Sequence, residues 1–378
     1  MIADLLIVGG GAIGLSLADC ALRNGLRVTL IDKGPLGQEA SWAGAGMLTC
    51  RPRLNRNPGS TDYHDLCLLS VKLHAQWSQR LLADTGIDIG YRVCGALELM
   101  FRSNDPAEYA DLLENIVPGS NARGIPAIVL SQSEARNLEP ALSVEVSGAV
   151  HFPGEAQVRN PRFLKALIKN VQRLGGELIE NRAVADIDVT AGRVAGVKLV
   201  DGTVLHVGAV AVCAGAWTSQ LARVVKLAPA SAKISPVRGQ LLAYKLDPKI
   251  AARLLTAGNH YIVPRGDGVL LVGATHENVG FEKAATAEGE AELTQFGHRI
   301  LPILKESRPV QSWSGLRPGL KGRHPLLGAV PGVQGLFISA GHYRNGLTLA
   351  PVSAELLVDT ILGRSPQISV ENWTPREV

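Results

Sequence analysis

Short apolar runs alternate with one amphipathic segment at the start of the chain. Residues 5–8 are all apolar and form a run of the length of a buried parallel strand. Apolar side chains then recur at helical spacing over 15–22, and Asn24-Gly25 supplies a helix stop. A second strand-like run covers 27–31. The pattern predicts strand, helix and strand, which is the opening unit of an α/β domain with a parallel sheet.

Three glycines lie between the first strand and the helix in the pattern G-x-G-x-x-G. Gly9 permits a tight turn, Gly11 lets the backbone approach a pyrophosphate, and Gly14 lets helix and strand pack closely. The helix N-terminus offers free N–H groups and a positive dipole end to phosphates. Asp32 ends the second strand, where it is placed to accept hydrogen bonds from ribose hydroxyls. The unit predicts a Rossmann-like dinucleotide site, but FAD and NAD both use it.

A string of small residues follows over 40–48, with the sequence ASWAGAGML. Small side chains in a row let a backbone lie flat against something large and planar, or let two helices approach closely. Because a dinucleotide unit lies just upstream, we favour a contact with the cofactor.

The rest of the chain mixes helical and strand patterns. Helices are predicted over 63–84, 106–116, 132–138, 160–174, 286–303 and 347–362, with Asn160 as an N-cap. Strands are predicted over 95–101, 177–179, 184–189, 194–200, 204–212, 239–246, 261–264, 268–274, 312–317 and 336–340. The run ending at 212 is again followed by small residues, which indicates a return to the dinucleotide domain.

The predicted fold class is therefore α/β, with a Rossmann-like dinucleotide domain interleaved with an α+β substrate domain built on an antiparallel sheet. We assign residues 1–85, 145–225 and 310–378 to the first domain, and residues 86–144 and 226–309 to the second.

Composition narrows the class of protein. The 378 residues carry a net charge of +4, with scattered basic residues and few aromatic ones, which argues against a nucleic-acid surface. The five cysteines form no C-x-x-C pair, which argues against a disulfide framework and a metal site. The N-terminus has no basic region before its apolar run, and no run reaches the ~20 apolar residues of a membrane span. We expect a cytoplasmic enzyme with no signal peptide.

Five stretches together resemble the FAD-dependent D-amino acid oxidase superfamily. They are the N-terminal unit with Asp32-Lys33, residues 43–48, residues 261–265 with 272–275, residues 315–319, and residues 341–347 with Ala350-Pro351. They occur in family order and extend nearly from end to end of the chain. Within the superfamily the chain is most similar to the bacterial glycine oxidases of the thiamine pathway.

The resemblance implies an extended FAD, with its pyrophosphate at the glycine turn and the backbone of Val184 beside the adenine. The implied cofactor residues are Gly9, Gly11, Ala12, Ile13, Gly14, Asp32, Lys33, Ala40, Ser41, Ala45, Gly46, Met47, Val184, Ala214, Gly215, Gly341, His342, Tyr343, Arg344, Asn345, Gly346, Leu347 and Thr348. Related sarcosine oxidases attach flavin through a cysteine or histidine. Because no cysteine follows Cys213, we predict non-covalent FAD.

The resemblance also implies the substrate residues. Arg317 matches the family's carboxylate anchor, and its planar fork suits a carboxylate. Tyr261 matches a position that hydrogen-bonds substrate, and Arg344 lies beside the expected flavin. The helix that opens near Gly346 would direct its positive end toward the flavin. We interpret His342 and His324 as loop or packing residues rather than acid–base groups.

The implied reaction is oxidation of glycine, sarcosine or a small D-amino acid by hydride transfer from Cα to flavin N5. The products would be an imine or 2-oxo acid, ammonia and, with O2, hydrogen peroxide. A homo-oligomer, either a dimer or a tetramer, is expected. Two positions depart from the family pattern. Trp42 replaces a small or hydroxyl residue, which leaves the cofactor contact there open, and Tyr343 replaces a common Phe.

Several alternatives stay open. A D-amino acid dehydrogenase would pass electrons to a quinone or carrier, and an N-methyl amino acid or D-proline oxidase would differ only in substrate. A non-catalytic dinucleotide-binding protein would not need a carboxylate clamp. An NAD dehydrogenase would give no role to the small-residue string or to the C-terminal loop.

Overall fold

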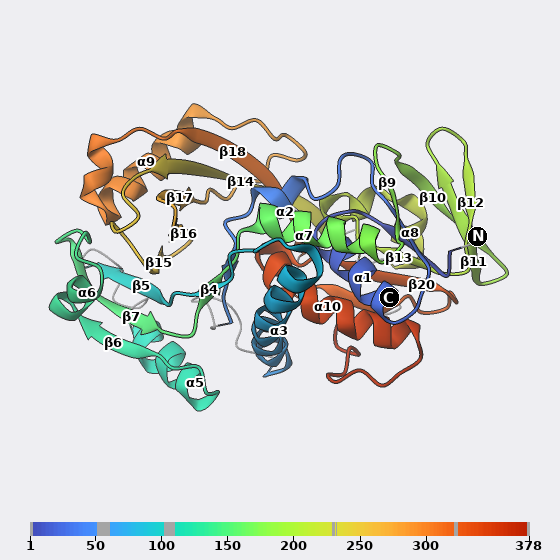
Figure 1. Ribbon diagram of the computed structural model, residues 1–378, viewed down its shortest axis with the longest axis horizontal. Helices are drawn as coiled ribbons and strands as arrows, with labels where there is room; N and C mark the ends of the chain where they lie inside the picture. The colour runs from blue at the N-terminus through green and yellow to red at the C-terminus, as the bar shows by residue number, and fades with distance from the viewer. Residues whose placement is uncertain are drawn as a thin grey trace.

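The computed structural model describes residues 3–50, 61–101, 110–228, 231, 233–320 and 324–375. Two large β-sheets lie side by side in it, and both ends of the chain lie on the side of the smaller sheet (Figure 1). No helix in the described part of the chain is long and apolar enough to cross a membrane.

The first sheet has six strands in the order β19-β20-β13-β1-β2-β9. Their bounds are β1 Leu5–Val8, β2 Val28–Ile31, β9 Glu177–Ile179, β13 Val210–Val212, β19 Leu326–Ala329 and β20 Leu336–Ala340. All neighbours pair in parallel except β19 with β20. This is the parallel sheet that the N-terminal pattern predicts, with β1 near its centre.

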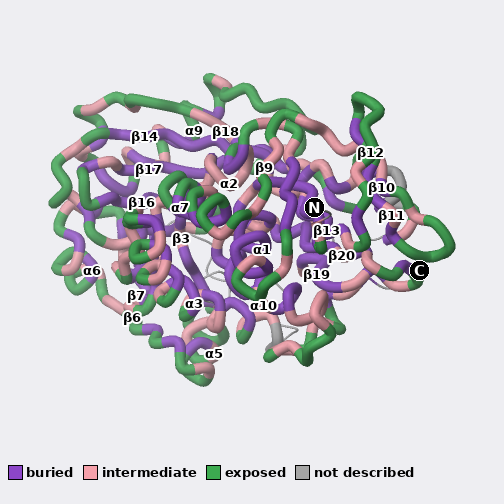
Figure 2. The backbone as a smooth tube through the Cα atoms, turned by 45° about the vertical axis from the view of Figure 1, so that its right-hand side comes forward, coloured by how far each residue is buried: buried purple, intermediate pink, exposed green. Residues whose placement is uncertain are grey.

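Alternate residues of β1 enter two different cores. Leu5 and Ile7 pack with the helices α1 (Ala12–Arg23), α3 (Thr61–Thr85), α7 (Asn160–Arg173) and α10 (Gly346–Ile361). Leu6 and Val8 face the other side, where the hairpin strands β10 (Val184–Thr190), β11 (Arg193–Leu199) and β12 (Val204–His206) cover the sheet. Figure 2 shows buried backbone through α1 and α10 at the centre of the molecule. The β1 strand is therefore buried on both faces, as its continuous apolar run predicts.

The second sheet has eight strands in the order β18-β14-β17-β16-β15-β5-β7-β6. Their bounds are β5 Ala96–Phe101, β6 Ile128–Ser131, β7 Val146–Phe152, β14 Ile234–Lys245, β15 Leu254–Ala257, β16 His260–Pro264, β17 Val269–Gly273 and β18 Gln311–Leu320. Every pair is antiparallel except β5 with β15. Helices α6 (Gln132–Leu138) and α9 (Ala287–Ile300) pack on one face.

Short elements complete the fold. A small sheet joins β3 (Met47–Leu48), β8 (Ala156–Gln157) and β4 (Arg92–Val93). The remaining helices are α2 Glu39–Ala43, α5 Val117–Ala122 and α8 Ala222–Leu227, with a π-helical segment Leu112–Ile116 and 3₁₀ turns Gly215–Gln220, Pro302–Glu306 and Tyr343–Asn345.

The strand pairing bears on the expected division of the chain. Strands β7 and β18 fall in segments 145–225 and 310–378, which the sequence assigns to the dinucleotide domain, yet both pair in the eight-stranded sheet. The two-domain division remains a proposal, and this pairing moves both strands to the substrate side. The sequence missed this because an isolated strand pattern does not say which sheet it joins.

Most predicted helices are confirmed to within a few residues, although the helix expected over 106–116 lies partly outside the described residues. The predicted cap of α7 is wrong. Arg159 is the N-cap, and Asn160 already lies in the helix. The Asn160 side chain makes other contacts instead, which are described below.

Candidate active site

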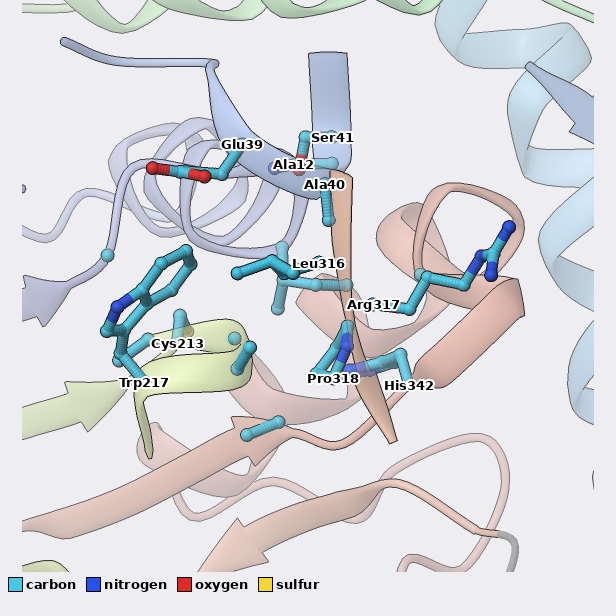
Figure 3. A pocket seen from close by; sticks show the side chains of 18 of the residues that line it. Ala12, Glu39, Ala40, Ser41, Cys213, Trp217, Leu316, Arg317, Pro318 and His342 are labelled. Carbon is cyan, nitrogen blue, oxygen red and sulfur yellow. Dashed lines mark hydrogen bonds between the residues drawn. The ribbon is translucent and has the colours of Figure 1, made fainter. Parts of the chain in front are cut away.

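One cavity of about 480 Å³ is lined by residues of both large sheets, and Figure 3 shows some of the side chains that line it. Its wall combines the β1–α1 turn, α2, the 3₁₀ turn after β13, the middle of β18 and the segment from β20 into α10. Every cofactor and substrate residue predicted from the sequence lines it except Gly14. Segments that lie more than three hundred positions apart in the chain therefore meet at a single cavity.

The glycine turn shows why each glycine is needed. Gly9 has a φ of +111°, and a Cβ there would lie 2.4 Å from the Cys213 carbonyl oxygen. A Cβ on Gly14 would lie 1.9 Å from the Gly9 carbonyl oxygen, so Gly14 packs against the turn and does not reach the cavity. Gly11 is the N-cap of α1. The turn thus brings bare backbone and a helix N-terminus to the cavity wall, which suits a pyrophosphate.

Asp32 closes this end of the cavity. Its carboxylate accepts hydrogen bonds from the backbone N–H groups of Gly10 at 2.6 Å and Gly34 at 2.9 Å. Burial raises the pKa of Asp32, although the two hydrogen bonds oppose that shift. The carboxylate is thus fixed at the end of β2, where it can also accept ribose hydroxyls.

The small-residue string lines the cavity, as the sequence predicts, and two buried side chains fix it. The Asn160 amide nitrogen lies 2.8 Å from each of the carbonyl oxygens of Ser41, Trp42 and Gly44. The buried Arg265 donates to the Ala45 carbonyl at 2.7 Å. Sequence reasoning did not assign either residue to the site. The Asn-Pro pair at 160 was the available signal, but it indicated a helix cap.

Trp42 does not obstruct the cavity. Its ring lies 5.8 Å from the ring of Trp313, whose indole nitrogen donates to the Ala43 carbonyl at 2.9 Å. Trp42 is not among the cavity-lining residues, and this departure from the family pattern contributes to packing between α2 and β18.

At the end of the cavity near Asp32, a group of charged and aromatic side chains forms part of the lining. The Lys33 ammonium sits 3.5 Å from the centre of the Trp217 ring. Glu39 forms ion pairs with Lys283 at 2.9 Å and with Lys33 at 3.7 Å. Glu39 and Trp217 line the cavity and were missed from the sequence. Trp217 follows the predicted Ala214-Gly215 contact directly, which was the only local signal for it.

Arg317 lies at the opposite end of the cavity from Trp217 (Figure 3). Its guanidinium donates to the Thr275 carbonyl at 3.0 Å. Burial lowers the pKa of Arg317, and the neighbouring Arg344 adds to this effect while Tyr261 opposes it. No acidic side chain in the described ranges forms an ion pair with Arg317. A partly desolvated cation with a carbonyl partner strongly favours an anionic ligand.

Arg344 lies beside it on the turn before α10. It donates to the Asn259 side chain at 3.0 Å and lies 3.5 Å from His276 Nδ1, which is also 2.8 Å from the Tyr343 hydroxyl. Tyr343 has a φ of +53°, in the left-handed region that non-glycine residues rarely adopt. The departure from Phe to Tyr at 343 thus places a hydroxyl at the site, bonded to a histidine that the sequence did not single out.

The two histidines that the sequence analysis interprets as packing residues lie in different surroundings. His342 is buried at the cavity wall, 3.1 Å from the Ser353 hydroxyl, and burial lowers its pKa to about 3. It is therefore neutral at ordinary pH. The ring of His324 lies 5.1 Å from the ring of Tyr63 and is not among the cavity-lining residues.

The residues present fit an extended flavin dinucleotide. A glycine turn and a helix N-terminus suit the phosphates, Asp32 suits a ribose, and a flat wall of small residues from Ala40 to Met47 suits a planar ring. The N-terminus of α10 begins at Gly346 on the cavity wall and presents a positive dipole end.

Known proteins similar to this chain in sequence and fold support that assignment. The family model described as DAO, FAD dependent oxidoreductase, matches residues 4–360. The glycine oxidase of Pseudomonas aeruginosa is 35% identical over 372 residues, which cover 98% of each chain. The bifunctional protein ThiO/ThiG of Synechocystis sp. is 32% identical over 99% of this chain, which spans 54% of that protein. The crystal structure of glycine oxidase from Geobacillus kaustophilus superposes with a TM-score of 0.92 at 30% identity, over 100% of this chain and 99% of that one.

Proposed function

The chain belongs to the DAO family of FAD-dependent oxidoreductases, and we propose that it oxidises glycine or another small amino acid, with non-covalent FAD as cofactor and O2 as electron acceptor. The observation that carries the substrate class is Arg317, a half-buried guanidinium with a backbone carbonyl as partner at one end of a dinucleotide-sized cavity.

The proposed reaction balances without a protein nucleophile. Bound FAD would supply the two-electron acceptor for a hydride from Cα, and the resulting iminium ion would lose one N–H proton to water to give the imine. Water then hydrolyses the imine to a 2-oxo acid and ammonia, and O2 takes up the two electrons and two protons as hydrogen peroxide. The protein's own residues bind and orient the amino acid, which is where most of their contribution to the rate arises.

Arg317 would bind the substrate carboxylate through its two-pronged guanidinium. Tyr261 and Arg344 also line the cavity, and they act in opposite directions on the pKa of Arg317, which Tyr261 raises and Arg344 lowers. Two guanidinium groups disfavour a third positive charge close by, so they would favour the neutral amine that hydride transfer requires. His342 is neutral and bonded to Ser353, so we assign it no proton transfer.

The N-terminus of α10 would favour negative charge on the cofactor. Its first turn, at Gly346 and Leu347, lines the cavity, and no acidic residue occurs in that turn. A helix dipole end and free N–H groups stabilise an anion most within their own first turn.

A substrate panel tests the function. The purified holoenzyme should release hydrogen peroxide under air with at least one of glycine, sarcosine, D-alanine and D-proline, and the ranking of kcat/KM gives the preferred substrate. Peroxide release separates an oxidase from a D-amino acid dehydrogenase, which would need a quinone or another carrier. An absence of oxidation of all four amino acids with either acceptor would refute the proposal.

The biological setting is also a proposal. A place in thiamine biosynthesis is supported by the bifunctional ThiO/ThiG relative, in which a chain like this one makes up about half of the protein.

We further propose a cytoplasmic homo-oligomer. The location is supported by the five cysteines, all within the described ranges, none of which forms a disulfide. Size-exclusion chromatography with light scattering tests the oligomeric state.

A further inference from the structure

We propose that Gly239 and Glu277 are positioning residues for the Arg317 guanidinium, which they hold ready for a substrate carboxylate. The proposal rests on the proposed function in that it concerns the same anchor. Neither residue lines the cavity, so both would act through Arg317 and its neighbour Thr275.

Gly239 forms the floor on which the guanidinium lies. It belongs to β14, which pairs with β18, the strand that carries Arg317. A Cβ built on Gly239 would lie 2.0 Å from Arg317 Nη2, 2.3 Å from Cζ and 2.5 Å from Nη1. All three contacts are with the guanidinium itself, so its flat face lies on the bare backbone of β14. Any side chain at position 239 must push the charged group away.

Thr275 provides the hydrogen-bond acceptor for the guanidinium. The Thr275 carbonyl oxygen accepts a hydrogen bond from Arg317 at 3.0 Å, and Thr275 is only 1% exposed. The Thr275 hydroxyl donates to Glu277 at 2.5 Å and accepts from the Gln240 backbone N–H at 2.9 Å. Thr275 is therefore tied both to the neighbouring strand and to Glu277, and its carbonyl has little freedom to turn.

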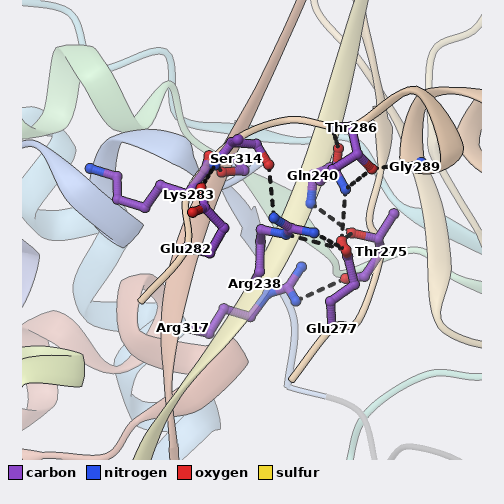
Figure 4. Close-up of polar contacts among 11 residues, drawn as sticks. Arg238, Gln240, Thr275, Glu277, Glu282, Lys283, Thr286, Gly289, Ser314 and Arg317 are labelled. Atoms are coloured by element: carbon purple, nitrogen blue, oxygen red, sulfur yellow. Dashed lines mark hydrogen bonds and ion pairs between the residues drawn. The ribbon is translucent and has the colours of Figure 1, made fainter. Parts of the chain in front are cut away.

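Glu277 is the centre of the polar network in Figure 4. One carboxylate oxygen accepts from Thr275 and from the Gln240 amide at 2.8 Å, and the other forms an ion pair with Arg238. Arg238 is only 5% exposed, so it requires this partner. The backbone groups of Arg238 and Glu277 also bond to each other, at 2.9 and 3.0 Å.

The network also leaves the positive charge of Arg317 without an acidic partner among the residues that the structure describes. Of the two arginines Arg238 and Arg317, Glu277 forms its ion pair with Arg238, whereas Arg317 donates to the Thr275 carbonyl. Arg317 receives a neutral carbonyl instead. A neutral acceptor orients the guanidinium without cancelling its charge, so the full attraction for a substrate carboxylate is retained.

Gly239→Ala is the most direct test, with Gly208→Ala as matched control. Both glycines have ordinary φ values, and a Cβ at position 208 meets nothing within 4 Å. In the Gly239→Ala holoenzyme we expect the KM for the best substrate and the inhibition constant of acetate, a simple carboxylate, to rise together by about tenfold or more. The kcat and the FAD content should stay within about twofold of wild type, since neither depends on the anchor alone. Gly208→Ala should change none of these quantities.

Glu277→Gln provides a second variant if Gly239→Ala does not fold. It keeps the shape of the side chain but removes the charge that pairs with Arg238, so we expect a smaller rise in the acetate constant, about threefold to tenfold. If a folded, FAD-loaded variant of each kind binds acetate as wild type does, the inference is wrong.

Acetate binding, followed as a change in the absorbance of bound FAD, does not depend on turnover. If the wild type oxidised no amino acid but its acetate affinity still depended on Gly239, the proposed function would fail and this inference would stand. If the wild type oxidised glycine but neither substitution changed the affinity for acetate, the proposed function would stand and this inference would fail.

Discussion

At its nucleotide end the cavity depends mainly on the backbone of one strand–helix–strand unit and on Asp32 at the end of that unit, whereas at its substrate end it depends on side chains from β16, β18 and the turn before α10. The first end needs Gly9, Gly14 and Asp32, which lie within one strand–helix–strand unit. The second needs Arg317 on β18, Tyr261 on β16 and Arg344 on the turn before α10.

The difference in construction predicts a difference in response. Backbone groups at the nucleotide end cannot be deleted, so they fail only when a new atom displaces them. Side chains at the substrate end can be removed singly, and each removal should affect substrate while leaving FAD in place. Substitutions at the two ends should therefore separate FAD binding from substrate binding.

Arg317→Ala should have the largest effect. It removes the proposed carboxylate anchor, and the loss of a charge-assisted pair in a partly buried site is worth ~3–5 kcal/mol, or about 10²–10³ or more in kcat/KM. The FAD content and absorbance should be those of wild type. Arg317→Lys keeps the charge but loses the planar fork, so it should recover only part of the rate. A kcat/KM within about tenfold of wild type in Arg317→Ala would contradict the site assignment.

Gly14→Ala should affect the opposite end. The new Cβ would lie 1.9 Å from the Gly9 carbonyl oxygen, which is a backbone atom of the turn and cannot rotate away as a flexible side chain could, so the turn must shift. We expect weaker FAD binding by about tenfold to a hundredfold, together with a loss of ~1–3 kcal/mol in the free energy of unfolding. FAD fluorescence titration and thermal unfolding measure the two effects. Gly154→Ala, where a Cβ meets nothing within 4 Å, is the matched control.

The two ends also differ in how far the sequence predicts them. The glycines and Asp32 lie close together in the sequence, so their spacing alone indicates a dinucleotide site. The supports of the substrate end are contacts between residues far apart in the chain, such as Gly239 under Arg317. In the sequence, Gly239 is an ordinary glycine in a strand, and only the pairing of β14 with β18 gives it a role.

Asn160 shows why local signals can mislead. An Asn-Pro pair before an apolar face is typical of a helix start, and α7 does start there. The amide nevertheless bonds to the backbone of residues 41–44, because the fold places α7 against α2. Local propensity predicted the helix correctly and the role of the side chain wrongly.

Asn160→Ala should therefore reduce both stability and FAD affinity. Three carbonyl groups would lose a buried partner, at a cost of ~1–3 kcal/mol in the free energy of unfolding. The small-residue wall would loosen, so FAD binding should weaken by about threefold to tenfold. Asn170→Ala is the matched control, because Asn170 is equally buried on α7 but bonds to Asp19 away from the cavity. It should lower stability and leave FAD affinity unchanged.

Glu277 gives the substrate end a pH dependence in acid. Burial opposes its ionisation, but hydrogen bonds from Arg238, Thr275 and Gln240 outweigh that effect and lower its pKa from 4.5 to about 2. A carboxyl whose pKa is lowered on folding stabilises the protein fully above its unfolded pKa, and the contribution is lost as the pH falls through the folded pKa. The difference in free energy of unfolding between wild type and Glu277→Gln should thus be constant above pH 4.5 and shrink toward pH 2. A difference that grows in acid would show that the sign is wrong.

Lys283→Ala should have the smallest effect. It removes the ion pair that joins Glu39 on α2 to the segment between β17 and α9 at the nucleotide end. The Lys283 side chain is 48% exposed, and exposed ion pairs contribute ~0–1 kcal/mol because water screens them and the side chains lose entropy. Glu39 also keeps Lys33 as a partner, which in turn lies over Trp217. We expect FAD affinity to fall by no more than about threefold at low salt and to match wild type at high salt, measured by titration of apoprotein with FAD. A larger, salt-independent loss would mean that the nucleotide end also depends on single side chains, and the contrast between the two ends would then not hold.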